Sequence, residues 1–186
     1  MIEKVNKGHP LSSEKTLCFL FAMALSKVVG SDLVIDFENQ CYEGLAGDSK
    51  YLDLLFYTSP NFKVAVEFKL PRSSTYGGSN QPQTRQNVYR DIARLHYLRH
   101  NSIIAGACYF LMAINESAYL NKGQYRSLPD LLVHHGHKVH ADNTILASGL
   151  LLTGAEFDFK WQYIRHQGSK YICDNNYAWL APMKIN

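Results

Sequence analysis

Short segments that alternate hydrophobic with polar residues, or that are apolar throughout, occupy much of the first half of the chain. Residues 33–43 (LVIDFENQCYE) alternate and predict a half-exposed strand. Residues 51–57 (YLDLLFY) and 63–70 (KVAVEFKL) predict two further strands, because both are rich in apolar residues and the turn sequence TSPN lies between them. The apolar run 102–114 (SIIAGACYFLMAI) predicts a central strand that is buried on both faces.

Two other segments repeat apolar residues at the spacing of a helix. Residues 13–29 predict a helix that starts after Ser12 or Ser13 as N-cap and ends near Gly30. Its predicted apolar stripe consists of Leu17, Phe21, Ala24 and Val28. Residues 84–100 predict a second helix, whose apolar face carries Val88, Ile92 and Leu95.

The order of these elements predicts an α/β fold in which helices flank a mixed central sheet. A single domain is expected over residues 1–186, with a core at about 12–114 and an extension at 115–186. The extension is predicted to contain a short helix around 128–135. It should end in a β-hairpin that pairs 156–166 with 171–173.

Composition and charge indicate the cellular compartment in which the protein is expected, but they do not identify a binding partner. The net charge of +3 permits a polyanionic partner but does not require one. The four cysteines, widely spaced and without a CxxC motif, predict free thiols in a reducing, cytoplasmic compartment. The apolar run at 17–25 is shorter than the roughly 20 residues of a membrane span, and Glu3 and Glu14 precede it, so neither a span nor a signal peptide is expected.

A carboxylate and an ammonium group stand two residues apart in the third predicted strand, at Glu67 and Lys69. If positions 57 and 63 pair across the TSPN turn, Asp53 lies opposite Glu67, because both pairs of numbers add up to 120. Two facing carboxylates repel each other unless a cation lies between them, and magnesium prefers such oxygen ligands. The alternative is an ordinary salt bridge between Glu67 and Lys69 on a solvent-facing strand.

The spacing of Asp53 from Glu67-Phe68-Lys69, placed between a preceding and a following helix, resembles the PD-(D/E)XK nuclease superfamily. This is the fold of many restriction endonucleases and junction resolvases. The proline that often precedes the first acidic residue is missing here, where the sequence reads YLD. The resemblance covers about residues 12–114 and implies a restriction-endonuclease-like core.

The resemblance also implies roles for individual residues. Asp53 and Glu67, together with the backbone carbonyl of Phe68, would bind Mg²⁺, for which Mn²⁺ could substitute. Lys69 would orient the attacking water. Two further catalytic assignments are Glu14, which would complete the metal shell, and Gln86, which would support the site, with Arg90 or Tyr89 as alternatives to Gln86. An acidic residue such as Glu14 is also favoured in a first helical turn by the helix dipole alone.

The implied reaction is metal-dependent hydrolysis of phosphodiester bonds, with DNA as the expected substrate. Arg72, Arg85 and Arg90 are candidates for phosphate contacts, around a Gly- and Ser-rich loop at 71–83 that is expected to be mobile. The arginines could equally form the solvated face of an amphipathic helix. A homodimer that cuts both strands is compatible with the short chain, and the alternative function is a catalytically inactive nucleic-acid-binding or assembly subunit.

Four histidines form a cluster in the sequence HHGHKVH, at His134, His135, His137 and His140. Imidazole is a common zinc ligand, but no cysteine lies nearby. The cluster is therefore interpreted either as a metal site or as ordinary loop histidines.

Overall fold

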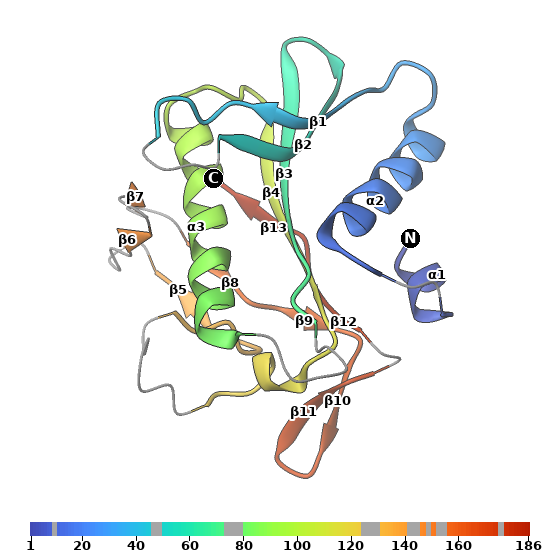
Figure 1. Ribbon diagram of the computed structural model, residues 1–186, viewed down its shortest axis with the longest axis vertical. Helices are drawn as coiled ribbons and strands as arrows, with labels where there is room; N and C mark the ends of the chain where they lie inside the picture. Colours follow the sequence, from blue (N-terminus) through green and yellow to red (C-terminus); the bar gives the residue numbers. More distant parts are fainter. Residues whose placement is uncertain are drawn as a thin grey trace.

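The computed structural model of the protein describes residues 1–8, 11–45, 50–72, 80–123, 131–140, 146–147, 150–151, 156–174 and 177–186. It is an α/β structure in which a mixed, seven-stranded sheet lies between two main helices (Figure 1). Within these residues, no helix combines the length and the apolar character needed to cross a membrane.

The first part of the chain follows the predicted order of elements. These are the helices α1 (Ile2–Asn6) and α2 (Glu14–Val29), the strands β1 (Val34–Gln40), β2 (Tyr51–Ser59) and β3 (Phe62–Lys69), the helix α3 (Gln81–His100) and the strand β4 (Ala107–Ile114). Ser13 caps α2 as expected, because its side chain accepts a hydrogen bond from the backbone N–H of Thr16. Only α1 was not predicted from the sequence.

The remaining elements are shorter. They are the 3-10 helix η1 (Ser117–Tyr119) and the strands β5 (Lys138–Val139), β6 (Leu146–Ala147), β7 (Leu150–Leu151), β8 (Phe157–Asp158), β9 (Trp161–Gln162), β10 (Ile164–Gln167), β11 (Lys170–Cys173), β12 (Ala178–Leu180) and β13 (Met183–Ile185). The predicted helix around 128–135 is wrong for residues 131–135, which form a coil and a turn, and its earlier residues lie outside the described part of the chain.

The sheet has the order β1-β2-β3-β4-β12-β9, and β13 also pairs with β4. The strands β3 and β4 are parallel, whereas the other pairs are antiparallel. Tyr57 pairs with Lys63, so the register inferred from the turn is confirmed. The C-terminal segment therefore completes the central sheet through β9, β12 and β13, which the sequence did not predict.

The predicted C-terminal hairpin is confirmed in part. The strands β10 and β11 pair from Ile164 with Cys173 to Gln167 with Lys170. Residues 156–162 are not part of it, because β8 pairs with β5 and β9 pairs with β12. In Figure 1 the hairpin projects from the end of the molecule where α3 begins.

The two faces of β3 contact different helices. Ala65 packs in the apolar cluster with Val88 and Ile92 of α3, whereas Val66 and Phe68 pack in the cluster on the α2 side. Figure 1 shows α2 and α3 on opposite sides of the sheet. β3, which carries Glu67 and Lys69, thus runs between two hydrophobic layers, with successive side chains on opposite faces.

The predicted stripe of α2 is only partly correct. Leu17 is buried and Phe21 packs edge-on against Phe68, with ring centroids 5.4 Å apart. Val28, however, is 85% exposed. The buried residues of α2 are Leu17, Cys18 and Ala22, and none lies in its last seven residues, because this end of the helix extends beyond the strands that it covers.

Candidate active site

Asp53 lies where β2 and β3 stop pairing. The paired register ends at Leu54 and Val66, and Asp53 is the next residue of β2. Its Oδ2 atom accepts a hydrogen bond of 2.7 Å from the backbone N–H of Phe68. On the other side of β2, Glu38 has a positive φ of 53°, and this distortion interrupts the β1 strand beside Asp53. The Asp53 side chain therefore satisfies the N–H of Phe68, which has no backbone partner in β2 where the two strands stop pairing.

Glu67 is buried among polar groups, with 2% of its surface exposed. Its Oε1 atom accepts a hydrogen bond of 2.9 Å from the hydroxyl of Tyr42 and lies 3.5 Å from Nη2 of Arg94. The Arg94 guanidinium lies over the Tyr42 ring, 4.0 Å from its centroid, and donates a hydrogen bond to the carbonyl of Tyr51. Glu67 is thus held rigidly by groups from α3 and from the segment between β1 and β2.

The pKa of Glu67 responds to the acidic groups around it. Burial, followed by the negative charges of Asp91 and Asp53 and by a hydrogen bond with the Asp53 side chain, raises the pKa of Glu67 well above its ordinary value. The charge of Arg94 opposes this rise. The hydrogen bond from the N–H of Phe68 to Asp53 brings the Asp53 side chain beside the residue that follows Glu67, while the convergence of the two carboxyl groups on one cation stays a prediction. The negative charges around Glu67 favour a proton or a cation there.

Lys69 connects the two helices that flank the sheet. Its Nζ atom lies 2.8 Å from Oδ2 of Asp91 in α3 and 3.3 Å from Oε2 of Glu14 in α2. Burial alone would lower the pKa of the Lys69 ammonium group, but the charges of Asp91 and Glu14 outweigh it and raise this pKa above its ordinary value. Lys69 is therefore a fixed, protonated donor beside the carboxylate pair.

Asp91 is the site residue that the sequence analysis missed. Besides Lys69, its Oδ1 atom lies 3.5 Å from Nη1 of Arg94 and 3.6 Å from Nε of Arg90. A signal was present, because Asp91 falls three residues after Val88 and four before Leu95, on the apolar stripe of the helix. A carboxylate on a buried stripe requires cationic partners, which the neighbouring residues supply.

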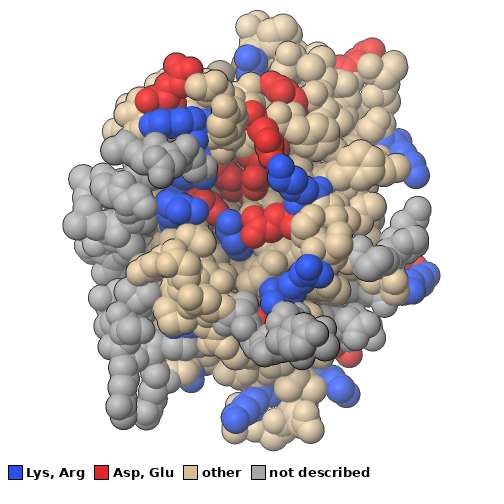
Figure 2. Space-filling model, in the orientation of Figure 1, with Lys and Arg blue, Asp and Glu red and all other residues tan. Residues whose placement is uncertain are grey.

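The charges of this cluster do not balance. Glu14, Asp53, Glu67 and Asp91 are four carboxyl groups, whereas Lys69, Arg90 and Arg94 are three cations. Figure 2 shows acidic side chains gathered at the centre of one face of the molecule, with Lys and Arg side chains around them. The excess negative charge suits either a bound proton or a metal ion.

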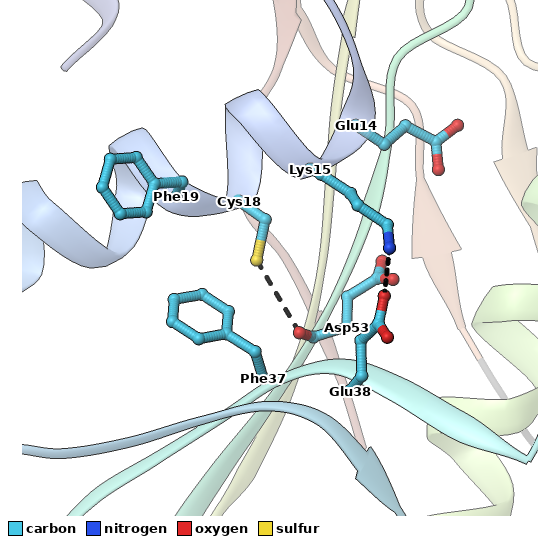
Figure 3. Close-up of a pocket in the computed structure, with 7 residues that line it drawn as sticks. All are labelled: Glu14, Lys15, Cys18, Phe19, Phe37, Glu38 and Asp53. Atoms are coloured by element: carbon cyan, nitrogen blue, oxygen red, sulfur yellow. Dashed lines mark hydrogen bonds and ion pairs between the residues drawn. The ribbon is translucent and has the colours of Figure 1, made fainter.

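A cavity of about 460 Å³ opens beside Asp53, between α2 and β1 (Figure 3). Glu14 of α2 and Asp53 of β2 both line it, so acidic residues of two different elements border the same space. Lys15 and Glu38 form an ion pair of 2.7 Å across this space. The Sγ atom of Cys18 lies 3.7 Å from the carbonyl oxygen of Asp53 and forms part of the cavity wall.

Of the other predicted catalytic positions, Phe68 is held beside Asp53 through its N–H, and the role of its carbonyl stays a prediction. Gln86 is exposed on α3, and no contact described for it reaches the cluster. Tyr89, one alternative to Gln86, is buried and donates a hydrogen bond of 2.7 Å to the carbonyl of Leu132. Asp91 is the α3 residue that reaches Lys69.

The predicted phosphate contacts have different environments. Arg85 is buried, with 2% exposure, so its guanidinium is not presented on the surface as predicted. Arg94, which was not among the predicted contacts, is also buried and pairs with Glu67 and Asp91. Arg72 is exposed and donates a hydrogen bond of 3.2 Å to the carbonyl of Leu11, while Arg90 is half-buried beside Asp91. The expected mobile loop lies for the most part, at 73–79, outside the described residues.

The histidine cluster is a packed feature rather than a cage of ligands. His135 accepts a hydrogen bond of 3.1 Å from the N–H of Trp161 through Nδ1, and the His137 ring stacks on Phe159 with centroids 6.1 Å apart. The rings of His134 and His137 are 5.2 Å apart. All four thiols are free, as predicted. Over the described ranges of the chain, no set of three His, Cys, Asp or Glu side chains is arranged to hold a metal ion.

Acid should destabilise the protein through His137. Burial, followed by the charges of His134, Lys122 and His140, lowers the pKa of His137 from 6.5 to about 4. Between these two pH values the unfolded chain binds more protons at His137 than the folded protein does. The free energy of unfolding therefore contains a contribution from His137 that is fully present above pH 6.5 and is lost as the pH falls toward 4. In urea denaturation at several pH values, His137→Gln should flatten this dependence, whereas His140→Gln, which removes only the smallest of these effects, should preserve most of it. An unchanged profile in His137→Gln would exclude this histidine as the cause.

Although no set of three such ligands is found among the described residues, the Asp53–Glu67 pair has the chemistry to bind a hard cation such as Mg²⁺. Magnesium is commonly held by one or two protein carboxylates and keeps several waters, so a third acidic ligand is not required. Burial first, and then the negative charges of Asp91 and Asp53, raise the pKa of Glu67, so a cation beside this carboxyl group would favour its charged form. The donor set, two carboxyl groups and nearby backbone, is composed of the oxygen atoms that this metal prefers.

Comparison with known proteins found no match among family models, curated proteins or solved structures. The functional interpretation of this chain therefore depends on the arrangement of its own residues.

Proposed function

We propose that the protein is a metal-dependent nuclease that hydrolyses phosphodiester bonds in DNA, with a site of the PD-(D/E)XK type. The observation that carries this proposal is the junction of β2 and β3, where Asp53 meets Glu67 and Lys69 follows on the same strand. The order α2, β1, β2, β3, α3, β4, with β3 parallel to β4, supports it, because the resemblance implies this order.

Asp53 and Glu67 would hold the magnesium ion, which when bound supplies charge neutralisation at the phosphate and an activated water. Tyr42 and Arg94 restrict the rotamer of Glu67, so the two carboxyl groups are in place before the metal arrives. Preorganisation of this kind lowers the cost of binding the cation, because little side-chain entropy remains to be lost.

Lys69 would orient the attacking water and stabilise the negative charge that develops on the phosphate. Its raised pKa keeps the ammonium group protonated, so it acts as a hydrogen-bond donor and not as a base. Asp91 and Glu14 each take one of its three donor directions. The third N–H bond can then point to a water or a phosphate oxygen.

One observation favours the second candidate, an inactive nucleic-acid-binding or assembly subunit. Glu67 Oε1 is already engaged by Tyr42 and Arg94, and a carboxylate neutralised by arginine attracts a metal ion less strongly. The two candidates differ in a single property, which is metal-dependent cleavage.

Purified protein should convert supercoiled plasmid or circular single-stranded DNA to cut products in the presence of Mg²⁺ or Mn²⁺, and EDTA should stop the reaction. Asp53→Asn should lower the rate by roughly 100-fold or more, because it removes a charged metal ligand and leaves a hydrogen-bond acceptor for Phe68. Asp36→Asn, at an exposed position of β1, is the matched control and should cut at the wild-type rate.

Calorimetric titration with Mn²⁺ separates the two candidates further. A nuclease should bind the ion in the wild-type protein and lose that binding in Asp53→Asn. If the wild-type protein binds DNA but neither binds Mn²⁺ nor cuts, the inactive subunit is the correct assignment.

A further inference from the structure

The cavity beside the candidate active site has two chemically different ends. One end carries the carboxylates of Glu14 and Asp53, and the other carries the rings of Phe19 from α2 and Phe37 from β1. Figure 3 shows both rings on the side of the cavity away from Glu14. A ligand that fills this cavity must combine a group suited to the acidic, metal-binding end with a flat or apolar group.

The rings of the two phenylalanines are accessible at the surface of the cavity. Phe19 is 56% exposed and Phe37 is 45% exposed, and both line the same cavity from different elements. Single exposed apolar side chains are common, but two aromatic rings that line one cavity beside a polar site are typical of a ligand site. Within the described residues, the ring pairs in contact do not include Phe19 with Phe37, so each ring offers a face.

The side chains between the two ends of the cavity carry no unpaired charge: one is an uncharged thiol, and two form an ion pair with each other. Burial raises the pKa of the Cys18 thiol to about 12, so this side chain remains uncharged. Lys15 is neutralised by Glu38 at 2.7 Å. The volume of about 460 Å³ lies within the range of about 300–1,000 Å³ of small-ligand sites.

We infer that this cavity binds an unpaired nucleobase next to the bond that is cut, so that the substrate is nucleic acid that is single-stranded at the cleavage site. The inference depends on the nuclease function proposed above. Every base has a π-face that stacks on aromatic side chains, whereas a base inside a duplex has both faces covered by its neighbours. The phosphate of the same nucleotide would then lie toward Asp53 and Glu14.

Binding is measured with Lys69→Ala protein, which removes the water-orienting group, using a labelled single-stranded oligodeoxythymidylate and a duplex of the same length. Phe19→Ala and Phe37→Ala should each weaken single-strand binding by about 5- to 150-fold, the range expected for the loss of one stacked base. Phe19→Tyr and Phe37→Tyr keep the ring and should retain the affinity. Phe62→Ala is the matched control, because Phe62 is 58% exposed but does not line the cavity.

Cleavage by the same variants with Lys69 restored separates this inference from the proposed function. If the wild-type protein cuts DNA but the Phe19 and Phe37 variants bind and cut single strands normally, the base site is wrong and the nuclease function stands. If the variants lose single-strand binding but wild-type protein never cuts with Mg²⁺ or Mn²⁺, the base site stands and the nuclease function is wrong. Absence of binding to any of these DNAs, or a change in self-association alone, overturns the base site.

Discussion

Replacing Lys69 by alanine should reduce the rate of DNA cleavage by roughly 100-fold or more while the protein remains folded and still binds Mn²⁺. The substitution removes the protonated donor from the site but leaves Asp53 and Glu67, the proposed ligands. Asp91 keeps two cationic neighbours, Arg94 at 3.5 Å and Arg90 at 3.6 Å, so it is not left as an isolated buried charge. Single-turnover cleavage measures the effect on chemistry directly.

Lys63→Ala is the control for this experiment. Lys63 lies on β3, on the same face of the alternation as Glu67 and Lys69, but near the other end of the strand. It should cut at the wild-type rate. A Lys69→Ala protein that retains more than about a hundredth of the wild-type rate would show that this ammonium group does not act in the reaction.

Replacing Asp91 by alanine should lower the free energy of unfolding by about 3–5 kcal/mol, which is the usual cost of removing one partner from a buried ion pair. Asp91 is 2% exposed, and its carboxylate partly neutralises the positive charges of Lys69, Arg90 and Arg94. Without Asp91, the cations around it stay in the protein interior with less negative charge nearby to offset their own. Urea denaturation followed by circular dichroism measures the change.

Asp32→Ala, at an exposed position between α2 and β1, should change the free energy of unfolding by no more than about 0.5 kcal/mol. If Asp91→Ala is as stable as Asp32→Ala, the ion pairs of Asp91 contribute nothing net and the cluster is maintained by the surrounding packing alone. A protein too unstable to purify would agree with the prediction, and Asp91→Asn then gives a measurable intermediate.

The local part of this fold could be predicted from the sequence. The register of β2 and β3 followed from one short turn, because a pairing at Tyr57 and Lys63 determines every pairing nearer to Asp53. Alternation also assigned the two faces of β3 correctly. Such features depend on residues that are close together in the sequence, and sequence patterns contain information mainly about such short-range relations.

Long-range features could not be predicted in the same way. Arg85 was predicted to contact phosphate or solvent because arginine is rarely buried, and only the docking of α3 on the sheet shows that Arg85 and Arg94 are both covered. The strands β12 and β13 are three residues each, too short for a pattern. They pair with different parts of the edge of β4 that β3 does not occupy. Tyr42 could not be recognised as a partner of Glu67, since the segment that carries it has no regular secondary structure.

Because β3 and β4 are parallel, the chain must cross back along the sheet between them, and α3 makes this connection, so the strand next to Glu67 and Lys69 is encoded after α3. A nascent chain that has emerged from the ribosome only as far as Lys69 lacks Asp91, Arg94 and the whole of β4. In such a chain the carboxyl groups of Asp53 and Glu67 have no cationic framework from α3. If the protein cuts nucleic acid, it would therefore become active only late in its own translation, after the messenger that encodes it has largely been read.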